Sequence, residues 1–499
     1  MIAQSIESML AARERKELVR LVVIGSVDDG KSTLIGRLLW ETGALYDDQI
    51  EQVRRATRNG DAIDFSLFTD GLRAEREQGI TIDVAHRYFE TRRRKFILAD
   101  TPGHAQYTRN MATGASTAHA GIVLVDARLG VLPQTRRHAA IASLLGIPRL
   151  LVAVNKMDLV GFEESVFRRI VSELREFAAP LGFAQLSFVP VSARLGDNVA
   201  LPSARMPWHR EGTVLDFFET VEVPRAQGPF RFPVQTVLRH GHRLLAGQIA
   251  SGSIAVGDEV VVLPSGARTR VSAIETWDGA LARAEAPMSI SLRLADEVDA
   301  GRGDLLAPPD AAPKPRQLLQ ATVVWLTERP LDPARAYLLK HTTRTVPARI
   351  EQVRSLLDPE TLEERPAASL RLNDVGRVAV RCARQVVCDP YRHNRSTGAF
   401  ILIDALSNET AAAGTISEGG EAGARRVEMV AAGSIALAHE VEELLAHAGH
   451  VAAVVQRPEA ALACAAAGII AIYAGDGPLP DALDLRHAAD WRQALRELL

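Results

Sequence analysis

The chain has 499 residues, 47% of them apolar and 24% charged, which is enough core material for several folded domains and excludes a disordered chain. Lysine and arginine number 58 against 61 aspartates and glutamates, and this near balance argues against a protein whose main task is to coat nucleic acid. The 3 cysteines form neither a disulfide framework nor a zinc spacing, and no signal-type or membrane-length segment is present, so we expect a cytoplasmic protein.

From Leu21 to about Val223 the sequence alternates short apolar runs with helical segments, which predicts a doubly wound α/β domain, and we assign residues 1–226 to it. The runs that we expect to be buried parallel strands are LVVIG (21–25), KFILAD (95–100), GIVLVD (121–126), LLVAVN (150–155) and LSFVPVS (186–192). Segments such as Lys31–Trp40 and Ser165–Ala178 have the pattern of the helices between them. Apolar strands alternating with helices are typical of an α/β domain with a mostly parallel sheet.

A glycine-rich loop lies between the first predicted strand and the first predicted helix. Its sequence, Gly25-Ser-Val-Asp-Asp-Gly-Lys31-Ser32, matches the pattern G-x-x-x-x-G-K-[ST]. The glycines allow backbone N–H groups to surround phosphates, and the helix N-terminus adds partial positive charge. We expect Lys31 to reach the β- and γ-phosphates and the Ser32 hydroxyl to bind Mg²⁺.

Four further residues belong with this phosphate end. Asp100-Thr-Pro-Gly103 follows a strand, so the Asp100 carboxylate can act on Mg²⁺ from its second coordination shell and the Gly103 N–H can sense a γ-phosphate. Thr81, in EREQGITID, can bind Mg²⁺ only while the γ-phosphate is present, which makes its loop a candidate switch. His104 can orient the attacking water; the alternative is a histidine that only packs or caps.

The base end is formed by the motifs that close the next two strands, Asn155-Lys-Met-Asp158 and Ser192-Ala193. The Asp158 carboxylate can accept from both N1–H and the 2-amino group of guanine, whereas adenine would leave it unpaired. We expect Asn155 to brace the loop and approach the base, Lys156 to cover its face, and the Ala193 N–H to bind O6. The four motifs together predict GTP and not ATP.

The expected site can be stated in full. The catalytic residues are Lys31, Thr81 and His104. The Mg²⁺ ligands are Ser32 and Thr81, with Asp100 behind them. The residues expected to contact the nucleotide are Gly25, Ser26, Val27, Asp28, Asp29, Gly30, Lys31, Ser32, Thr33, Asp100, Gly103, Asn155, Lys156, Asp158, Ser192 and Ala193.

From residue 227 the pattern changes to strand-length runs separated by turn residues. Residues 227–312 and 313–416 each predict a small antiparallel β-barrel, and the composition break APPDAAPKP (307–315) falls between them. Residues 417–499 begin with SEGGEAGARR, a flexible-looking joint, and continue with a strand–helix order that predicts a small α/β extension.

Longer stretches around these motifs carry a family resemblance over about residues 15–416. The matching stretches are VDDGKSTLIGRLLWETGALYDDQ (27–49), TDGLRAEREQGITIDVAHRYFETRRRKFILADTPGHAQYTRNMATGAS (69–116), DARLGVLPQTRRHAAIASLLGI (126–147), NKMDL (155–159), GDNVA (196–200), RFPVQTV (231–237) and TGAFILIDALSNET (397–410). They resemble the translation-factor class of GTPases and, within it, the large, GTP-hydrolysing subunit of bacterial sulfate adenylyltransferase.

The resemblance implies a GTPase domain followed by two β-barrels, and it implies a partner. That partner is a small ATP-binding subunit, which converts ATP and sulfate to adenosine 5′-phosphosulfate and pyrophosphate while GTP hydrolysis drives the reaction. A nucleic-acid or membrane partner is not expected.

Two departures from the family pattern stand out. The family usually has an acidic residue where this chain has Ala105, although alanine also occurs there in translation factors. Residues 417–499 resemble a truncated, degenerate adenylylsulfate kinase domain in which Gly433-Ser-Ile-Ala lacks G-K-[ST], so we expect no kinase activity.

Two other functions share the same GTP motifs. A translation elongation factor that delivers aminoacyl-tRNA needs a broad basic face, which the net charge of −3 does not indicate. The run Arg92-Arg93-Arg94-Lys95 is interpreted as a solvated hairpin tip and not as a nucleic-acid patch. A regulatory protein that binds GTP without hydrolysing it is disfavoured by the intact set Lys31, Thr81, Asp100 and His104.

Overall fold

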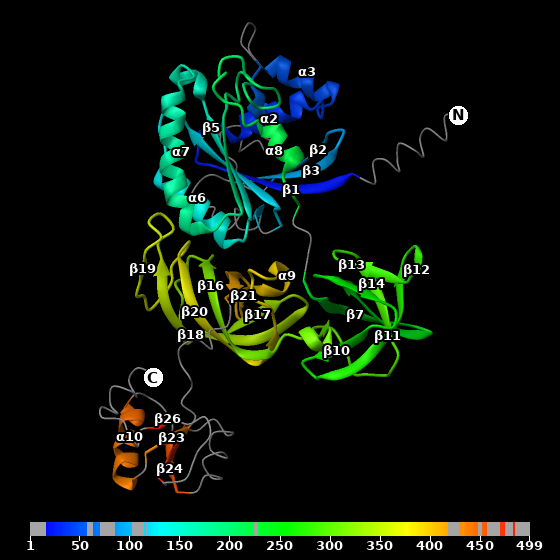
Figure 1. Cartoon of the computed structure of the whole chain (residues 1–499), viewed down its shortest axis with the longest axis vertical. Helices are drawn as coiled ribbons and strands as arrows, with labels where there is room; N and C mark the ends of the chain where they lie inside the picture. Colours follow the sequence, from blue (N-terminus) through cyan, green and yellow to red (C-terminus); the bar gives the residue numbers. More distant parts are fainter. Residues whose placement is uncertain are drawn as a thin grey trace. The chain divides into compact units, whose positions relative to one another are not determined.

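The computed structural model describes residues 16–56, 63–69, 85–101, 114–115, 117–223, 228–417, 429–432, 434–447, 452–456, 470–474 and 483–484. The chain divides into two compact units, Met1–Glu418 and Gly419–Leu499 (Figure 1). Within the described ranges, no helix is long and apolar enough to cross a membrane.

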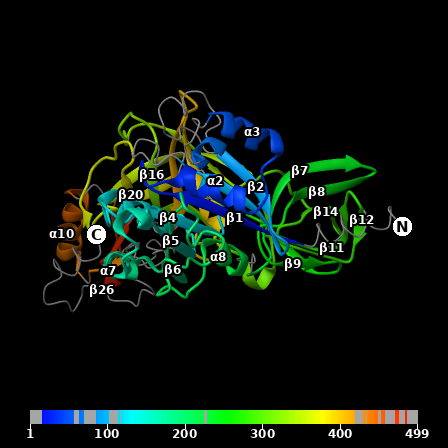
Figure 2. The same cartoon turned by 90° about the horizontal axis from the view of Figure 1, so that it is seen from above.

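The first unit begins with a six-stranded sheet in the order β2-β3-β1-β4-β5-β6, parallel except for the antiparallel edge pair β2–β3. Its strands are β1 (Glu17–Ile24), β2 (Ala85–Glu90), β3 (Arg94–Asp100), β4 (Ala120–Asp126), β5 (Arg149–Asn155) and β6 (Gln185–Pro190). Its helices are α2 (Lys31–Glu41), α3 (Asp47–Ala56), α6 (Pro133–Leu144), α7 (Glu164–Ala178) and α8 (Val214–Thr220), with short 3₁₀ turns η1 (Phe65–Phe68), η3 (Met157–Val160) and η4 (Ala179–Leu181). Figure 2 shows the same sheet from above.

The two faces of β1 show how the layers form. Leu21 and Val23 pack with residues of α2 and α8 in one core cluster, while Val22 and Ile24 pack with residues of α6 in another. A strand covered on both faces has few solvent-facing positions, which is why the sequence of β1 is apolar from Leu21 to Ile24. The predicted doubly wound, mostly parallel sheet is confirmed.

Two closed, six-stranded antiparallel barrels follow, as the sequence predicts. The first runs β10-β15-β7-β8-β14-β11 and closes through β10–β11, and the second runs β17-β21-β22-β16-β20-β18 and closes through β17–β18. The elements of the first barrel region, green in Figure 1, are β7 (Phe232–His240), β8 (His242–Gln248), β9 (Ser253–Ala255), β10 (Glu259–Leu263), β11 (Ala267–Thr276), β12 (Gly279–Leu281), β13 (Arg283–Glu285), β14 (Ser289–Leu294), β15 (Leu305–Ala307) and η5 (Pro309–Ala311). Those of the second are β16 (Pro315–Trp325), β17 (Tyr337–His341), β18 (Arg344–Leu357), β19 (Glu364–Arg365), β20 (Val375–Val387), α9 (Arg395–Gly398), β21 (Ala399–Asp404) and β22 (Thr410–Ile416).

The second unit is a small α/β fold with a parallel sheet in the order β24-β25-β23-β26. Its elements are β23 (Met429–Ala431), α10 (Ile435–His447), β24 (Ala452–Val455), β25 (Ile470–Tyr473) and β26 (Leu483–Asp484). The predicted α/β extension is therefore confirmed as a fold class. Gly433 lies outside the described residues.

A buried ion pair joins the two barrels. Arg231, which precedes β7, donates through Nε and Nη2 to the two carboxylate oxygens of Asp389, each at 2.9 Å. Thr397 Oγ1 donates to the same carboxylate at 2.6 Å. Burial alone would raise the pKa of Asp389, but these hydrogen bonds outweigh it and hold the pKa below its ordinary value.

We expect Asp389→Ala to destabilise the barrel pair by about 3–5 kcal/mol, because it leaves the Arg231 charge buried without a partner. The measurement is the urea midpoint of the full chain. Asp299→Ala is the control, since Asp299 is fully exposed and lies 4.0 Å from Arg243, and it should leave the midpoint unchanged. Because the folded-state pKa of Asp389 is depressed, its contribution is present above the ordinary Asp pKa and is lost as the pH falls through the folded value. Equal midpoints for Asp389→Ala and the parent would show that the ion pair does not stabilise the chain.

Candidate functional site

The phosphate loop joins β1 to α2, and its shape depends on glycine and lysine. Gly30 has φ +90°, and a Cβ there would lie 2.5 Å from Nδ2 of Asn155, so a larger residue does not fit. Lys31 begins α2, and its buried ammonium donates to the carbonyl oxygens of Gly25 at 2.8 Å and Ser26 at 2.9 Å. Burial lowers the pKa of Lys31, against the opposing charges of nearby carboxylates. The lysine therefore spans the loop that the motif assigns to phosphates.

The side chain of Asp29 folds back into the same loop, a contact that was not predicted. Its carboxylate is 2% exposed and accepts from the Ser26 N–H at 2.6 Å. Burial raises the pKa of Asp29. The sequence does contain a signal for this contact, because Asp29 lies three residues after Ser26 in the same loop. Short acidic side chains readily accept hydrogen bonds from nearby backbone N–H groups. Ser26 N–H is thus engaged within the chain.

Ser32 and Asp100 place two oxygen donors beside the phosphate loop. Ser32 lies in the first turn of α2, while Asp100 ends β3, is 3% exposed and pairs in register with Val23 of β1. The Asp100 charge acts directly on Lys31. A hydroxyl and a carboxylate are ligands of the kind that Mg²⁺ prefers, so these residues fit the predicted cation. Thr81, Gly103 and His104 lie outside the described residues.

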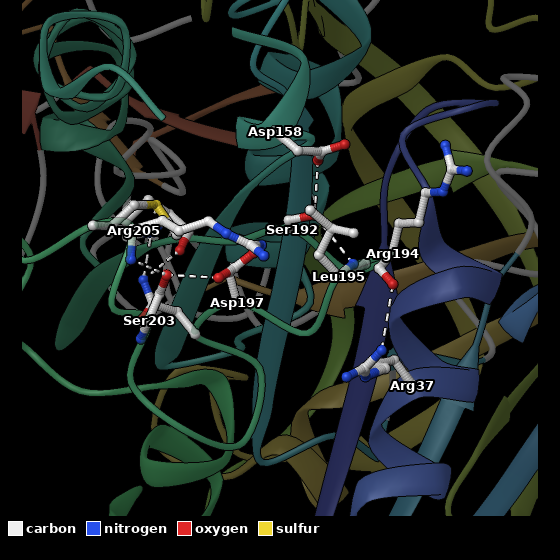
Figure 3. A network of polar contacts seen from close by, with 12 residues as sticks. Arg37, Asp158, Ser192, Arg194, Leu195, Asp197, Ser203 and Arg205 are labelled. Carbon is white, nitrogen blue, oxygen red and sulfur yellow. Dashed lines mark hydrogen bonds and ion pairs between the residues drawn. The ribbon is translucent and has the colours of Figure 1, made fainter. Parts of the chain in front are cut away.

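The two loops that are predicted to read the base meet where β5 and β6 end (Figure 3). Ser192 Oγ donates to Oδ1 of Asp158 at 2.7 Å and accepts from the Leu195 N–H at 3.3 Å. The hydroxyl thereby fixes how the carboxylate is turned. An ionised carboxylate has about four acceptor positions, so Asp158 keeps acceptor capacity for a base.

Asn155 connects the predicted phosphate end of the site to the predicted base end. Its Nδ2 donates to the carbonyl oxygen of Asp29 at 2.7 Å, and its Oδ1 accepts from the Ala193 N–H at 3.0 Å. These contacts brace the two loops against each other. The Ala193 N–H, expected to bind guanine O6, donates to Asn155 in this structure.

Lys156 is held by a buried carboxylate that was not among the predicted site residues. Asp126, at the end of β4, is 2% exposed and accepts from Lys156 Nζ at 2.9 Å and from Arg128 Nη2 at 2.6 Å. Burial alone would raise the pKa of Asp126, but the hydrogen bonds from Arg128 and Lys156 lower it to about 2. Lys156 Nζ also donates to the carbonyl oxygen of Asp28. The side chain thus reaches from the base loop to the phosphate loop.

The described candidate residues therefore gather at one edge of the sheet, where the parallel strands end. This edge is the common ligand site of open α/β sheets. The residues brought together are Gly25, Ser26, Val27, Asp28, Asp29, Gly30, Lys31, Ser32, Thr33, Asp100, Asn155, Lys156, Asp158, Ser192 and Ala193.

Comparison with known proteins gives this architecture a family. Residues 16–260 match the family model described as elongation factor Tu GTP binding domain, and residues 318–417 match GTP-eEF1A C-terminal domain-like. Sulfate adenylyltransferase subunit 1 of Bacteroides fragilis is 49% identical over 419 residues, which are 82% of this chain and 88% of the relative. Bifunctional enzyme CysN/CysC of Rhodopirellula baltica is 48% identical over 85% of this chain and 67% of its own length.

Among solved structures, sup35 complexed with GMPPNP aligns with 81% of this chain and 94% of its own, at 24% identity and a TM-score of 0.38. The identity of about one half to the Bacteroides fragilis relative, over most of both chains, confirms the resemblance read from the motifs. The chain belongs to the sulfate adenylyltransferase subunit 1 family of enzymes, and its nucleotide domain is a GTP-binding domain of the elongation factor Tu type.

Proposed function

We propose that the chain is the GTPase subunit of a sulfate adenylyltransferase and that its GTP hydrolysis drives sulfate activation on a partner subunit. One observation supports this most strongly. A relative named sulfate adenylyltransferase subunit 1 is 49% identical over 419 residues, which are 82% of this chain and 88% of the relative. The loops themselves contact each other through Asn155 and Asp29, as one composite site requires.

In this proposal the phosphates of GTP lie in the loop from Gly25 to Thr33, against backbone N–H groups and the Lys31 ammonium. Guanine lies at the other end, where Asp158 accepts from N1–H and the 2-amino group. Ser192 fixes that carboxylate, as the 2.7 Å contact indicates. Lys156 covers the base face, while the Ala193 N–H is shared between Asn155 and O6.

The hydrolytic step needs charge compensation and a positioned water more than a strong base. Mg²⁺, when bound, neutralises phosphate charge; Ser32 would hold it directly, and Asp100 would act through its water ligands. Thr81 is proposed to add a second hydroxyl while the γ-phosphate is present. His104 is proposed to orient the water that attacks the γ-phosphorus, with GDP and inorganic phosphate as products.

The adenylylation step is assigned to a small ATP-binding partner subunit. That subunit would convert ATP and sulfate to adenosine 5′-phosphosulfate and pyrophosphate. The name "subunit 1" of the relatives supports a multi-subunit enzyme. The sequence has one G-x-x-x-x-G-K-[ST] loop, at residues 25–32, which this proposal commits to GTP. The second unit is proposed to have no adenylylsulfate kinase activity, because residues around Gly433 lack that motif.

The test follows labelled sulfate with ATP, with and without GTP and the small subunit. We expect adenosine 5′-phosphosulfate only when both subunits are present, and more of it with GTP. The partner should also raise the GTPase rate, because a switch that responds to the partner is needed to transfer energy.

Two outcomes would contradict the proposal. One is product formed by this chain alone, and the other is a pair of subunits that GTP does not affect. The first would assign adenylylation to this chain and not to a partner. The second would favour the alternative of an elongation factor-type GTPase that delivers aminoacyl-tRNA, which an aminoacyl-tRNA binding assay would then examine.

A further inference from the structure

The guanidinium of Arg37 lies between helix α2 and the loop that follows β6 (Figure 3). Its Nε pairs with Oε1 of Glu41 at 2.5 Å, and its Nη1 donates to the carbonyl oxygen of Arg194 at 3.3 Å. Its central carbon lies 4.8 Å from the ring centroid of Phe65. The side chain is 20% exposed. Contacts on three sides hold this long side chain in one orientation.

Gly196 shows how closely that guanidinium approaches the loop. A Cβ at this position would lie 2.2 Å from Nη2 of Arg37 and 2.6 Å from its central carbon. The residue also has φ +89°, which a side chain disfavours. Its N–H donates to the carbonyl oxygen of Ser192 at 2.7 Å and closes the turn. Any side chain at position 196 must therefore displace Arg37.

The loop that Arg37 contacts is the loop that carries the base-reading groups. Ser192, bonded to Asp158, and Ala193 immediately precede Arg194. At the other end of the same helix, Lys31 lies six residues before Arg37, which at about 1.5 Å per residue is about 9 Å along the axis. One rigid helix thus connects the phosphate end of the site to the base loop.

We infer that Arg37 is a positioning residue for guanine recognition. It fixes the loop from Ser192 to Gly196 against the helix that begins at the phosphate loop, and so keeps Asp158 and the Ala193 N–H in register with a bound base. Because Nη1 contacts a backbone carbonyl, the identity of side chain 194 does not matter for this contact. The inference rests on the proposed GTP site and deepens it.

The test compares GTP, GDP and inosine 5′-triphosphate, which lacks the 2-amino group that Asp158 reads. In the full-length Arg37→Ala chain we expect GTP and GDP to bind about tenfold more weakly, by equal factors, since the loss is at the base and not at the γ-phosphate. The affinity for inosine triphosphate should fall by a smaller factor, so the preference for GTP over inosine triphosphate should fall several-fold. The readout is the dissociation constant by calorimetry.

Arg205→Ala is the matched control. Arg205 pairs with Asp197 of the same loop region at 2.8 Å, but its side chain is 53% exposed and it has no contact with α2 among those that the structure describes. An exposed pair of this kind contributes little. Its removal should change neither affinity nor the GTP preference by more than about twofold.

Gly196→Ala tests the same contact from the loop side. It should lower GTP preference as Arg37→Ala does, and the double variant should be no worse than Gly196→Ala alone, because the guanidinium that the new methyl group displaces is already gone. If Arg37→Ala does not fold, Arg37→Lys replaces it. The lysine ammonium keeps a positive charge beside Glu41 but cannot also reach the Arg194 carbonyl as the guanidinium does, so we expect the same loss of preference for GTP over inosine triphosphate.

Some outcomes would overturn the inference. If Arg37→Ala lowers only the melting temperature, with parental affinities and GTP preference in the folded chain, Arg37 is a structural residue and nothing more. If the losses of GTP preference in the two single variants add up in the double variant, the two positions act through different contacts. A parent chain that does not bind GTP would instead contradict the proposed function.

Discussion

Lys31→Ala should abolish measurable GTP binding while both β-barrels stay folded. The ammonium is buried and donates to two carbonyl oxygens across the phosphate loop, so the substitution removes the cation and leaves those carbonyls without their donor. Hydrogen bonds that involve a charged group contribute about 1.5–3 kcal/mol each, so a loss of about 100-fold or more in affinity is expected. The measurement is GTP binding by calorimetry, with circular dichroism to follow the fold.

Lys16→Ala is the matched control for this variant. Lys16 precedes β1 at the end away from the phosphate loop, where its Nζ donates to the carbonyl oxygen of Thr91 at 2.7 Å. Its removal should leave GTP affinity unchanged. Undiminished affinity in Lys31→Ala would exclude residues 25–32 from the nucleotide site.

The layered fold could be predicted because its signals are local. The apolar run of β1, the glycine-lysine motif after it and the helical pattern from Lys31 each follow from neighbouring residues. The contact between Tyr391 and Leu145, in which the tyrosine hydroxyl donates to a backbone carbonyl at 2.7 Å, joins residues 246 positions apart. No local pattern indicates such a pairing, because it depends on how the second barrel packs against α6.

The basic run at residues 92–95 shows a similar limit. The predicted hairpin is present, since β2 and β3 pair as antiparallel neighbours on either side of it. The interpretation as a solvated tip is wrong for Arg94, whose guanidinium pairs with Glu17 at 2.8 Å and donates to the Phe218 carbonyl oxygen at 3.2 Å. A run of basic residues indicates an exposed turn, but it does not show which of these residues donates a hydrogen bond to a carbonyl oxygen far away in the sequence.

The candidate site, too, could be predicted only in part. Spacing within motifs identified the residue types and placed them at one edge of the sheet. The contact of Asp29 with Ser26 has a local signal, since both residues lie in one loop. The role of Asp126, which holds Lys156, could not be predicted, because it depends on the loops after β4 and β5 closing on one another.

Asp158→Asn should shift base preference from guanine toward xanthine. In the parent, Ser192 donates to Oδ1, which leaves Oδ2 for the base. In the variant we expect the amide oxygen to keep the Ser192 hydroxyl, which places the NH₂ group where Oδ2 was. That group can donate to the C2 carbonyl of xanthine, whereas it opposes the N–H donors of guanine. Donors left unpaired in a partly buried site cost about 1–3 kcal/mol, so GTP affinity should fall by about 5- to 150-fold while XTP affinity rises.

The measurement is the pair of dissociation constants for GTP and XTP in the parent and in Asp158→Asn. Asp197→Asn is the matched control, because Asp197 lies in the same loop region and accepts instead from Ser203 Oγ at 2.6 Å and from Arg205 at 2.8 Å. Its substitution should leave base preference unchanged, which would show that removing a carboxylate near the loop is not enough. If Asp158→Asn discriminates guanine from xanthine as the parent does, the base is read by another loop, and the contact between Ser192 and Asp158 only holds the ends of β5 and β6 together.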